Sequence, residues 1–182
     1  MACDLTLGRK EPCKDSVGGI KAVYFADFGD ITVAYDSTDT DVVEDLGSVT
    51  VLEYQLKGNN SFEQTINSNR ENGTSFFEQT LSITLKKLTV QDHKELKLMS
   101  YGRPHIVVHD YNGNAFLMGN EHGCEVTGGT IVTGAAMGDL SGYTLTFTAQ
   151  EQLPANFLEG ATEANAFAGM TSTPTVTQGT NS

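Results

Sequence analysis

Residues 49–88 read VTVLEYQLKGNNSFEQTINSNRENGTSFFEQTLSITLKKL, and this stretch decides the fold that the sequence predicts. From residue 77 on, apolar and polar side chains alternate along the second half. This pattern is typical of a β-strand with one buried face and one face in water. The apolar face carries Phe77, Leu81, Ile83 and Leu85, and the polar face carries Glu78, Thr80, Ser82, Thr84 and Lys86.

The whole stretch predicts a long two-stranded ribbon, with residues 49–68 as the first arm and residues 74–88 as the second. Its arms exceed the usual strand of about five to six residues, and an isolated hairpin is barely stable in water. We therefore expect the ribbon to lie against something, and other copies of the chain are the simplest partner. The tip, where Asn-Gly permits a tight reversal, consists of Asn69, Arg70, Glu71, Asn72 and Gly73.

The composition indicates one domain with appendages. The chain has 182 residues, of which 38% are hydrophobic, and a formal net charge of −12. This charge argues against a non-specific nucleic-acid binder, which needs clustered cations, and against docking on an anionic membrane. It is compatible with a protein past which DNA moves without binding.

The N-terminus has no basic region followed by an apolar run, and no stretch reaches the ~18 apolar residues of a membrane helix. We expect a protein without a secretory signal, made in a reducing cytoplasm. Three cysteines, an odd number, do not suggest a disulfide framework. They are Cys3, Cys13 and Cys124, and a Cys3–Cys13 bridge stays open.

The chain predicts three parts: an N-terminal arm (1–19), a β-domain (20–158), and a C-terminal tail (159–182) that is flexible or ordered by assembly. One helix is expected over residues 89–101, with Thr89 as its N-cap and Gly102 after its end. Residues 36–47 look like an acidic loop. The remaining strands are expected at 20–26, 31–35, 106–111, 115–119, 125–133 and 143–151.

We find no set of residues that requires catalysis or a cofactor. A nucleophile with a base and an orienting group is not apparent. His122 and Cys124 could contribute to a metal site, but a loop histidine beside a buried cysteine is the simpler interpretation. The expectation is a protein that is not an enzyme and has no metal or cofactor.

Three segments resemble a known family. They are GAAMGD (134–139), the strand GYTLTFTAQE (142–151) and PANFL (154–158). Together with the order of strands, long hairpin, helix and strands over residues 20–158, they resemble the bacteriophage tail tube proteins. The resemblance implies a mainly β fold, a barrel or sandwich with one short helix and a protruding hairpin.

The resemblance also implies a function. Subunits would stack as hexameric rings into the channel for DNA in the virion tail, with themselves and other tail proteins as partners and DNA passing without specific binding. The polar face of residues 78–86 would face the lumen, and the apolar face of residues 77–85 would pack outward and between subunits. Between residues 49 and 88 acids and bases balance, so a repulsive lumen is a hypothesis.

Two other classes of function remain open. One is a different virion component on the same fold, such as a tail terminator, a head–tail connector or a tail-tip protein. The other is a soluble ligand-binding β-domain, which would predict clustered aromatic residues on an exposed face. The chain has no tryptophan, which weighs against the ligand-binding domain.

Overall fold

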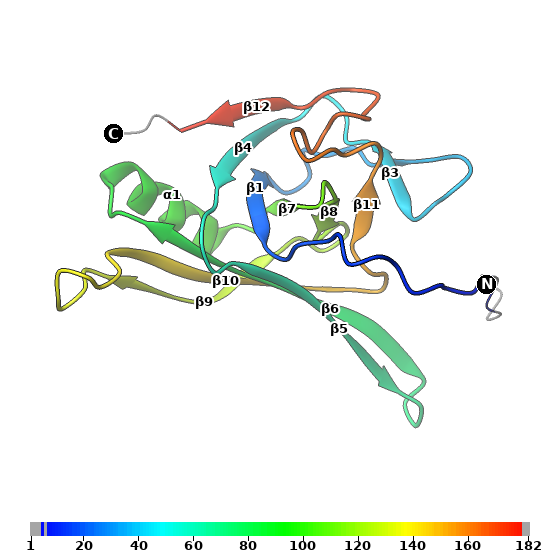
Figure 1. The fold of residues 1–182 in the computed structure, drawn as a ribbon, viewed down its shortest axis with the longest axis horizontal. Helices are drawn as coiled ribbons and strands as arrows, with labels where there is room; N and C mark the ends of the chain where they lie inside the picture. Colours follow the sequence, from blue (N-terminus) through cyan, green and yellow to red (C-terminus); the bar gives the residue numbers. More distant parts are fainter. Residues whose placement is uncertain (1–4, 6, 180–182) are drawn as a thin grey trace.

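The computed structural model describes residues 5 and 7–179. The protein is mainly β and forms two sheets that face each other, and neither closes into a barrel among the described residues (Figure 1). This confirms the predicted class and favours a sandwich over a closed barrel. Sheet A has the order β12-β4-β1-β7-β8-β11-β3-β2, and sheet B has the order β5-β6-β10-β9.

The bounds of the strands follow. Sheet A contains β1 Ile20–Ala26, β2 Ala34–Tyr35, β3 Val42–Asp45, β4 Thr50–Gln55, β7 His105–Asp110, β8 Ala115–Met118, β11 Asn156–Leu158 and β12 Thr175–Gln178. Sheet B contains β5 Ser61–Asn69, β6 Thr74–Lys86, β9 Glu125–Val132 and β10 Gly142–Glu151.

The main core lies between the two sheets, because both contribute strands with alternating apolar residues. From sheet A, Val23 and Phe25 point into it, and from sheet B, Leu81 and Phe147 meet them. The ring centroids of Phe25 and Phe147 are 5.3 Å apart. Burying such side chains is the main stabilising contribution to a fold of this kind.

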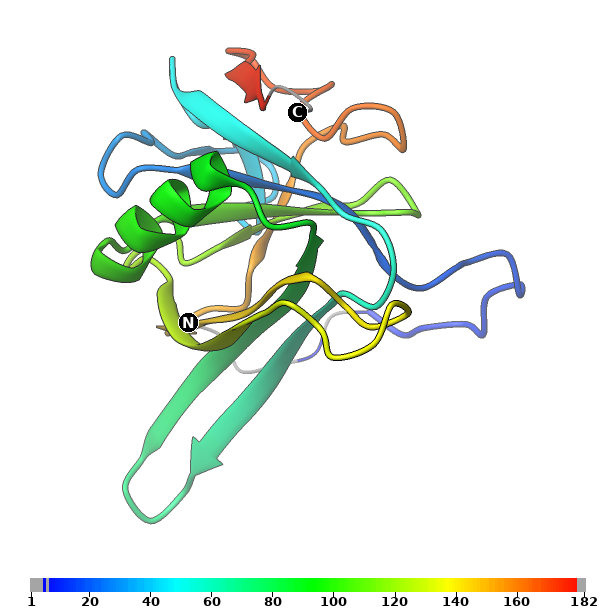
Figure 2. The same cartoon turned by 90° about the vertical axis from the view of Figure 1, so that its left-hand side faces the viewer.

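Helix α1, Val90–Tyr101, confirms the predicted helix. The Thr89 side chain accepts a hydrogen bond from the Asp92 N–H at 3.0 Å, as expected of an N-cap. Leu96 and Met99 pack against the core from one end of the space between the sheets (Figure 2). No helix in the described chain is long and apolar enough to cross a membrane.

The predicted first arm of the ribbon is wrong. Residues 50–55 form β4, which pairs with β1 in sheet A, and only β5 pairs with β6. The chain crosses from one sheet to the other over residues 56–60, where Gly58 has φ +111°, a conformation that favours glycine. The Asn60 Oδ1 then accepts from the Thr84 N–H at 2.8 Å and fixes the entry to β5. Apolar and polar residues alternate on both sides of this crossing. The sequence pattern therefore does not reveal that residues 50–55 and residues 61–69 belong to different sheets.

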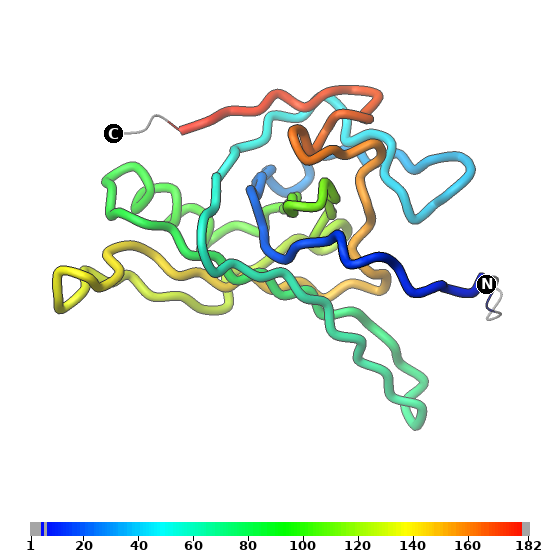
Figure 3. Tube along the Cα trace, viewed as in Figure 1, coloured from blue at the N-terminus to red at the C-terminus, as the bar shows by residue number. Residues whose placement is uncertain are grey.

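The region expected to be a C-terminal tail folds back onto the domain (Figure 3). Phe167 is 1% exposed, and its ring lies 4.9 Å from that of Tyr24, centroid to centroid. His109 Nε2 lies 2.8 Å from the Thr162 carbonyl oxygen. Strand β12 then adds to sheet A parallel to β4. The domain therefore extends well beyond residue 158, while residues 7–19 are exposed and contain no helix or strand.

Two further elements differ from the sequence prediction. Strand β3 lies inside the predicted acidic loop, where it pairs parallel to β11 and antiparallel to β2. Of the strand expected at 31–35, only β2 is formed. By contrast, the β7–β8 hairpin forms where Asn112-Gly113-Asn114 predicts it.

Candidate assembly surface

The outer face of sheet B, which points away from the core, is covered with hydroxyl groups. On this face Thr144, Thr146 and Thr148 of β10 lie directly opposite Thr84, Ser82 and Thr80 of β6. Thr127 of β9 continues the rows, and its Oγ1 lies 2.9 Å from the Oγ1 of Thr148. Four of the five residues that the sequence assigns to the lumen are half-exposed in this face, and Lys86 is exposed at its end.

Few charges lie among these hydroxyls. Strand pairing places three carboxylates and one ammonium group on this face. The excess of two negative charges per copy is small and is spread over the sheet. The four residues are Glu63, Glu78, Glu125 and Lys86.

The inner face of β6 places the predicted packing residues as follows. Leu81 and Ile83 are buried in the core, Leu85 packs against it while half-buried, and Phe77 is half-buried near the base of the hairpin. Their position against the chain's own core explains their apolar character. The role of these four residues between subunits stays a prediction.

Gln79 is a buried residue that sequence reasoning missed. It is 1% exposed, and its Oε1 accepts from the Gly119 N–H at 3.0 Å, which ties the turn after β8 to sheet B. The sequence did contain a signal for this burial. Because side chains alternate along a strand, residue 79 lies on the same face as Leu81 and Ile83. A glutamine at an apolar position of a strand indicates a buried hydrogen bond.

The β5–β6 hairpin extends past the end of β10. The last row shared with β10 contains Phe77, which pairs with Glu151 on one side and Ile66 on the other. Beyond it the hairpin stands free, and Ile66 is 67% exposed. At the tip, the Asn69 Oδ1 accepts from the N–H groups of Glu71 and Asn72 at 2.9 and 3.2 Å. The predicted tip residues 69–73 are all exposed and preformed.

Sheet B has two edges without a strand partner among the described residues, β5 and β9. All of its neighbouring pairs are antiparallel, so β5 and β9 run in opposite directions. Such edges present unpaired N–H and C=O groups to any strand that can pair with them.

The two edges are also staggered. Thr65, in the middle of β5, lies level with Glu78, whereas Gly128, near the middle of β9, lies level with Ser82. This offset is about 13 Å along the strands over about 14 Å across them. The sheet is therefore slanted by roughly 45°, close to the 35–45° tilt of strands in closed barrels.

A polar cluster lies where β10 ends, at the turn between β8 and β9. Glu151 is 4% exposed, and its Oε1 accepts from the N–H groups of Glu121 and His122 at 3.1 and 2.9 Å. One ligand atom from each of these three residues lies within 4.8 Å of the others, so they form a His–carboxylate group able to hold a cation. The buried carboxylate already fixes this turn through its backbone.

Cys124 takes no part in that cluster. It is fully buried in the core, and burial raises the pKa of its thiol well above the usual value. A loop histidine beside a buried cysteine, the simpler interpretation of the sequence, is therefore what the structure shows, and His122 and Cys124 do not share a site. His105 is also buried, and its Nδ1 lies 2.6 Å from the Gly119 carbonyl oxygen; burial lowers the pKa of its ring. Cys13 is exposed, and Cys3 lies outside the described residues.

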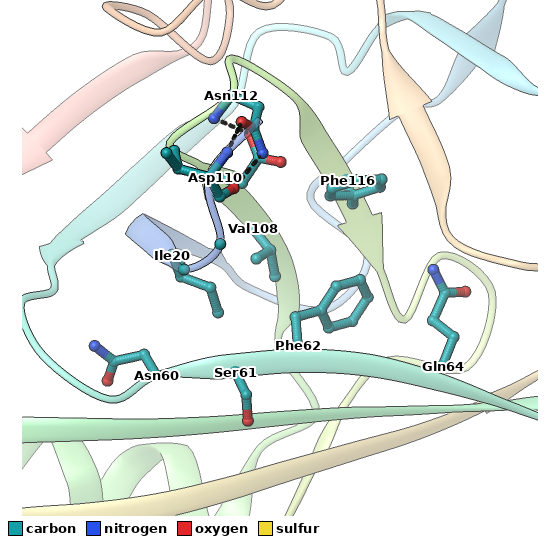
Figure 4. Close-up of a pocket in the computed structure, with 12 residues that line it drawn as sticks. Ile20, Asn60, Ser61, Phe62, Gln64, Val108, Asp110, Asn112 and Phe116 are labelled. Carbon is teal, nitrogen blue, oxygen red and sulfur yellow. Dashed lines mark hydrogen bonds between the residues drawn. The ribbon is translucent and has the colours of Figure 1, made fainter. Parts of the chain in front are cut away.

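A cleft of about 440 Å³ opens between the sheets beside β5 (Figure 4). Phe62, Val108 and Phe116 form its apolar floor. At its rim, Asp110 Oδ1 accepts from the Asn112 N–H at 2.9 Å, and Asn112 bonds the backbone of Val17. A strand added to the free edge of β5 would lie next to the mouth of this cleft.

Comparisons with protein-family models, curated proteins and solved structures gave no match.

Proposed function

We propose that the protein is a virion structural protein of the tail tube type, which assembles into rings that stack around a channel for DNA. Sheet B carries this proposal, because a sheet with one buried face, one hydroxylated face and two open edges is suited to complete itself with further copies. The free edges are the strongest feature, since natural proteins usually cover or shorten such edges.

The strand directions support ring closure. If copies are related by rotation about one axis, β9 of one copy meets β5 of the next in antiparallel orientation, so the closed sheet is antiparallel throughout. The observed slant supplies the stagger that closure requires. Six copies would give about 24 strands, more than the 16–18 strands that already enclose a water-filled channel.

The outer face of sheet B suits the wall of such a channel. Hydroxyl groups remain hydrated and bind phosphate weakly compared with lysine or arginine clusters. A slight excess of carboxylates opposes the counterion release that drives non-specific DNA binding. DNA could then pass without being held.

The free part of the hairpin has a role in this arrangement. Ile66 and Phe77 lie where this free part begins, in the last row shared with β10, on the inner side of the sheet but outside the core between the sheets. An exposed isoleucine there is explained if a neighbouring copy covers it. The neighbour's body would thereby support a hairpin that has little stability alone.

The test is a pair of matched variants. Ile66→Lys places a charge where the neighbouring copy should pack, and we expect it to abolish ring formation while the monomer stays folded. Leu98→Lys is the control, because Leu98 is a similarly exposed apolar residue (61%) that lies on α1 and not on an edge strand. Sedimentation velocity should show rings for wild type and Leu98→Lys, and monomers for Ile66→Lys. Equal behaviour of all three would refute the proposal.

A further inference from the structure

The two ends of sheet B carry different charges. At the end where β10 finishes, the chain presents an acidic turn, residues 36–41, which leads into β3. The Asn156 Nδ2 donates to the Asp41 carbonyl oxygen at 3.2 Å, and Phe157 pairs with Val42. Since Asn156 follows β10 by only a few residues, these contacts place the acidic turn at that end, beside β3 in Figure 1.

The acidic turn is preformed. The Asp36 Oδ1 accepts from the N–H groups of Thr38 and Asp39 at 2.5 and 3.1 Å, and the Asp39 Oδ1 accepts from the Asp41 N–H at 3.1 Å. The hydrogen bonds from Thr38 and Asp39 lower the pKa of the Asp36 carboxyl group, so it stays ionised at neutral pH. Residues 36–45 contain five carboxylates and neither lysine nor arginine.

The opposite end of sheet B concentrates exposed lysines. Strand β6 ends there at Lys86, and α1 begins shortly after it. Lys57 lies at the same end, because Gly58 approaches the Lys86 ammonium group. Residues 86–103 contain five cations and two carboxylates in a chain whose formal charge is −12. The exposed lysines are Lys57, Lys86, Lys87, Lys94 and Lys97.

A groove runs between three of these lysines, Lys57, Lys86 and Lys87. It has a volume of about 950 Å³ and is bounded by β4, the end of β6, the first turn of α1 and β12. Lys57 and Lys86 are exposed in its lining, whereas its acids Glu53, Asp92 and Glu95 are half-buried. A partner approaching from solvent therefore meets ammonium groups first.

We infer that the acidic turn of one copy docks against the lysine end of a copy in the next ring, so that the rings stack with a fixed polarity. This inference rests on the proposed function, because β5 and β9 are used within the ring and only the strand ends are left for stacking. The contact joins two different surfaces, so it repeats without limit as a tube requires. Charge attraction would select the orientation in which unlike ends meet.

Two charge-reversal variants test this contact. Ser37→Lys, Thr40→Lys and Asp41→Lys together change the formal charge of the acidic turn, residues 36–41, from −3 to +1 and keep Asp36 and Asp39, whose carboxylates hold the turn. Lys86→Glu, Lys94→Glu and Lys97→Glu together change the formal charge of residues 86–103 from +3 to −3, which makes the lysine end negative even with Lys57. Each variant has two like ends, so we expect rings of normal size whose stacks are at least about tenfold shorter than those of wild type at low salt.

Mixing preformed rings of the two variants is the decisive step. Every contact between unlike variants then joins a positive end to a negative end, so electron microscopy should show stacks again. Single variants that stack as wild type does, or a mixture that fails to stack, would overturn the inference while leaving ring formation intact. If wild type forms no rings at all, the proposed function fails, and the stacking contact with it.

Discussion

Sheet A and sheet B differ in how many of their faces are buried within the chain. In the middle of sheet A, Val23 is 0% exposed toward one core and Tyr24 is 7% exposed toward a second core on the other side. In the middle of sheet B, Phe147 is 0% exposed, but its neighbours Thr146 and Thr148 face outward and are half-exposed. In their middle strands, sheet A therefore buries both faces within one copy, whereas sheet B buries only one.

This difference shows which sheet keeps one face open to solvent in a single copy. The C-terminal segment around Phe167 covers the far side of sheet A, and no described segment does the same for sheet B. Chains that bury both faces of a sheet use continuous apolar runs, and chains that leave one face wet use alternation. The Thr-rich alternation of β6 and β10 therefore indicates a face that stays in water.

The largest expected effect contrasts the two faces of β10. Phe147→Ala leaves a cavity between the sheets and should lower the free energy of unfolding by about 3–5 kcal/mol. Thr146→Ala, one residue away on the outer face, should lower it by less than about 1 kcal/mol. Urea denaturation of the purified variants measures both. Similar losses for the two would mean that the outer face is buried as well.

A smaller effect should separate two glutamines that lie on opposite faces of sheet B, Gln79 and Gln150. Gln79→Ala leaves the Gly119 N–H without its acceptor inside the protein and should cost about 1–3 kcal/mol of unfolding free energy. Gln150, which is exposed on the outer face, is the matched control, and Gln150→Ala should change stability by less than about 0.5 kcal/mol. Equal values from urea denaturation would contradict the assignment of the two faces.

The smallest expected effect is a loss of unfolding free energy at alkaline pH, and it comes from two tyrosines of sheet A. Burial, followed by nearby carboxylates, raises the pKa of both Tyr24 and Tyr54 from 10.0 to about 12. Because the folded pKa is higher, the stabilising contribution is complete below pH 10 and is lost as the pH rises toward about 12. Tyr54→Phe should therefore lose less stability than wild type between pH 10 and 12. Ultraviolet titration of tyrosinate would contradict this if Tyr54 ionised at its ordinary pKa.

Local patterns in the sequence predicted the elements that depend on neighbouring residues. Thr89 and Gly102 mark α1, Asn112 to Asn114 mark the β7–β8 hairpin, and alternation marks both faces of β6. These features have local causes: an N-cap bond, a turn conformation and the period of a strand. They gave the class of the fold and the hydroxylated face of the candidate surface.

Features set by distant contacts were not predictable in the same way. Strand β12 is formed because β4, far away in the chain, provides a parallel edge, and nothing in residues 175–178 signals that partner. Phe167 is the one aromatic residue in a segment of mostly small and polar residues. This segment has no helix or strand periodicity, so the sequence predicted a tail. The crossing at Gly58 was missed because alternation continues in both sheets. The stagger and the charge of the two sheet ends likewise appear only once the strands are paired.

Electron microscopy of the concentrated, purified chain tests the central claim most directly. The account predicts rings of constant bore in which Thr146 faces the channel and β5 of each copy lies antiparallel to β9 of the next. A monodisperse monomer at high concentration, or a ring whose bore is lined by any surface other than the outer face of sheet B, would contradict it.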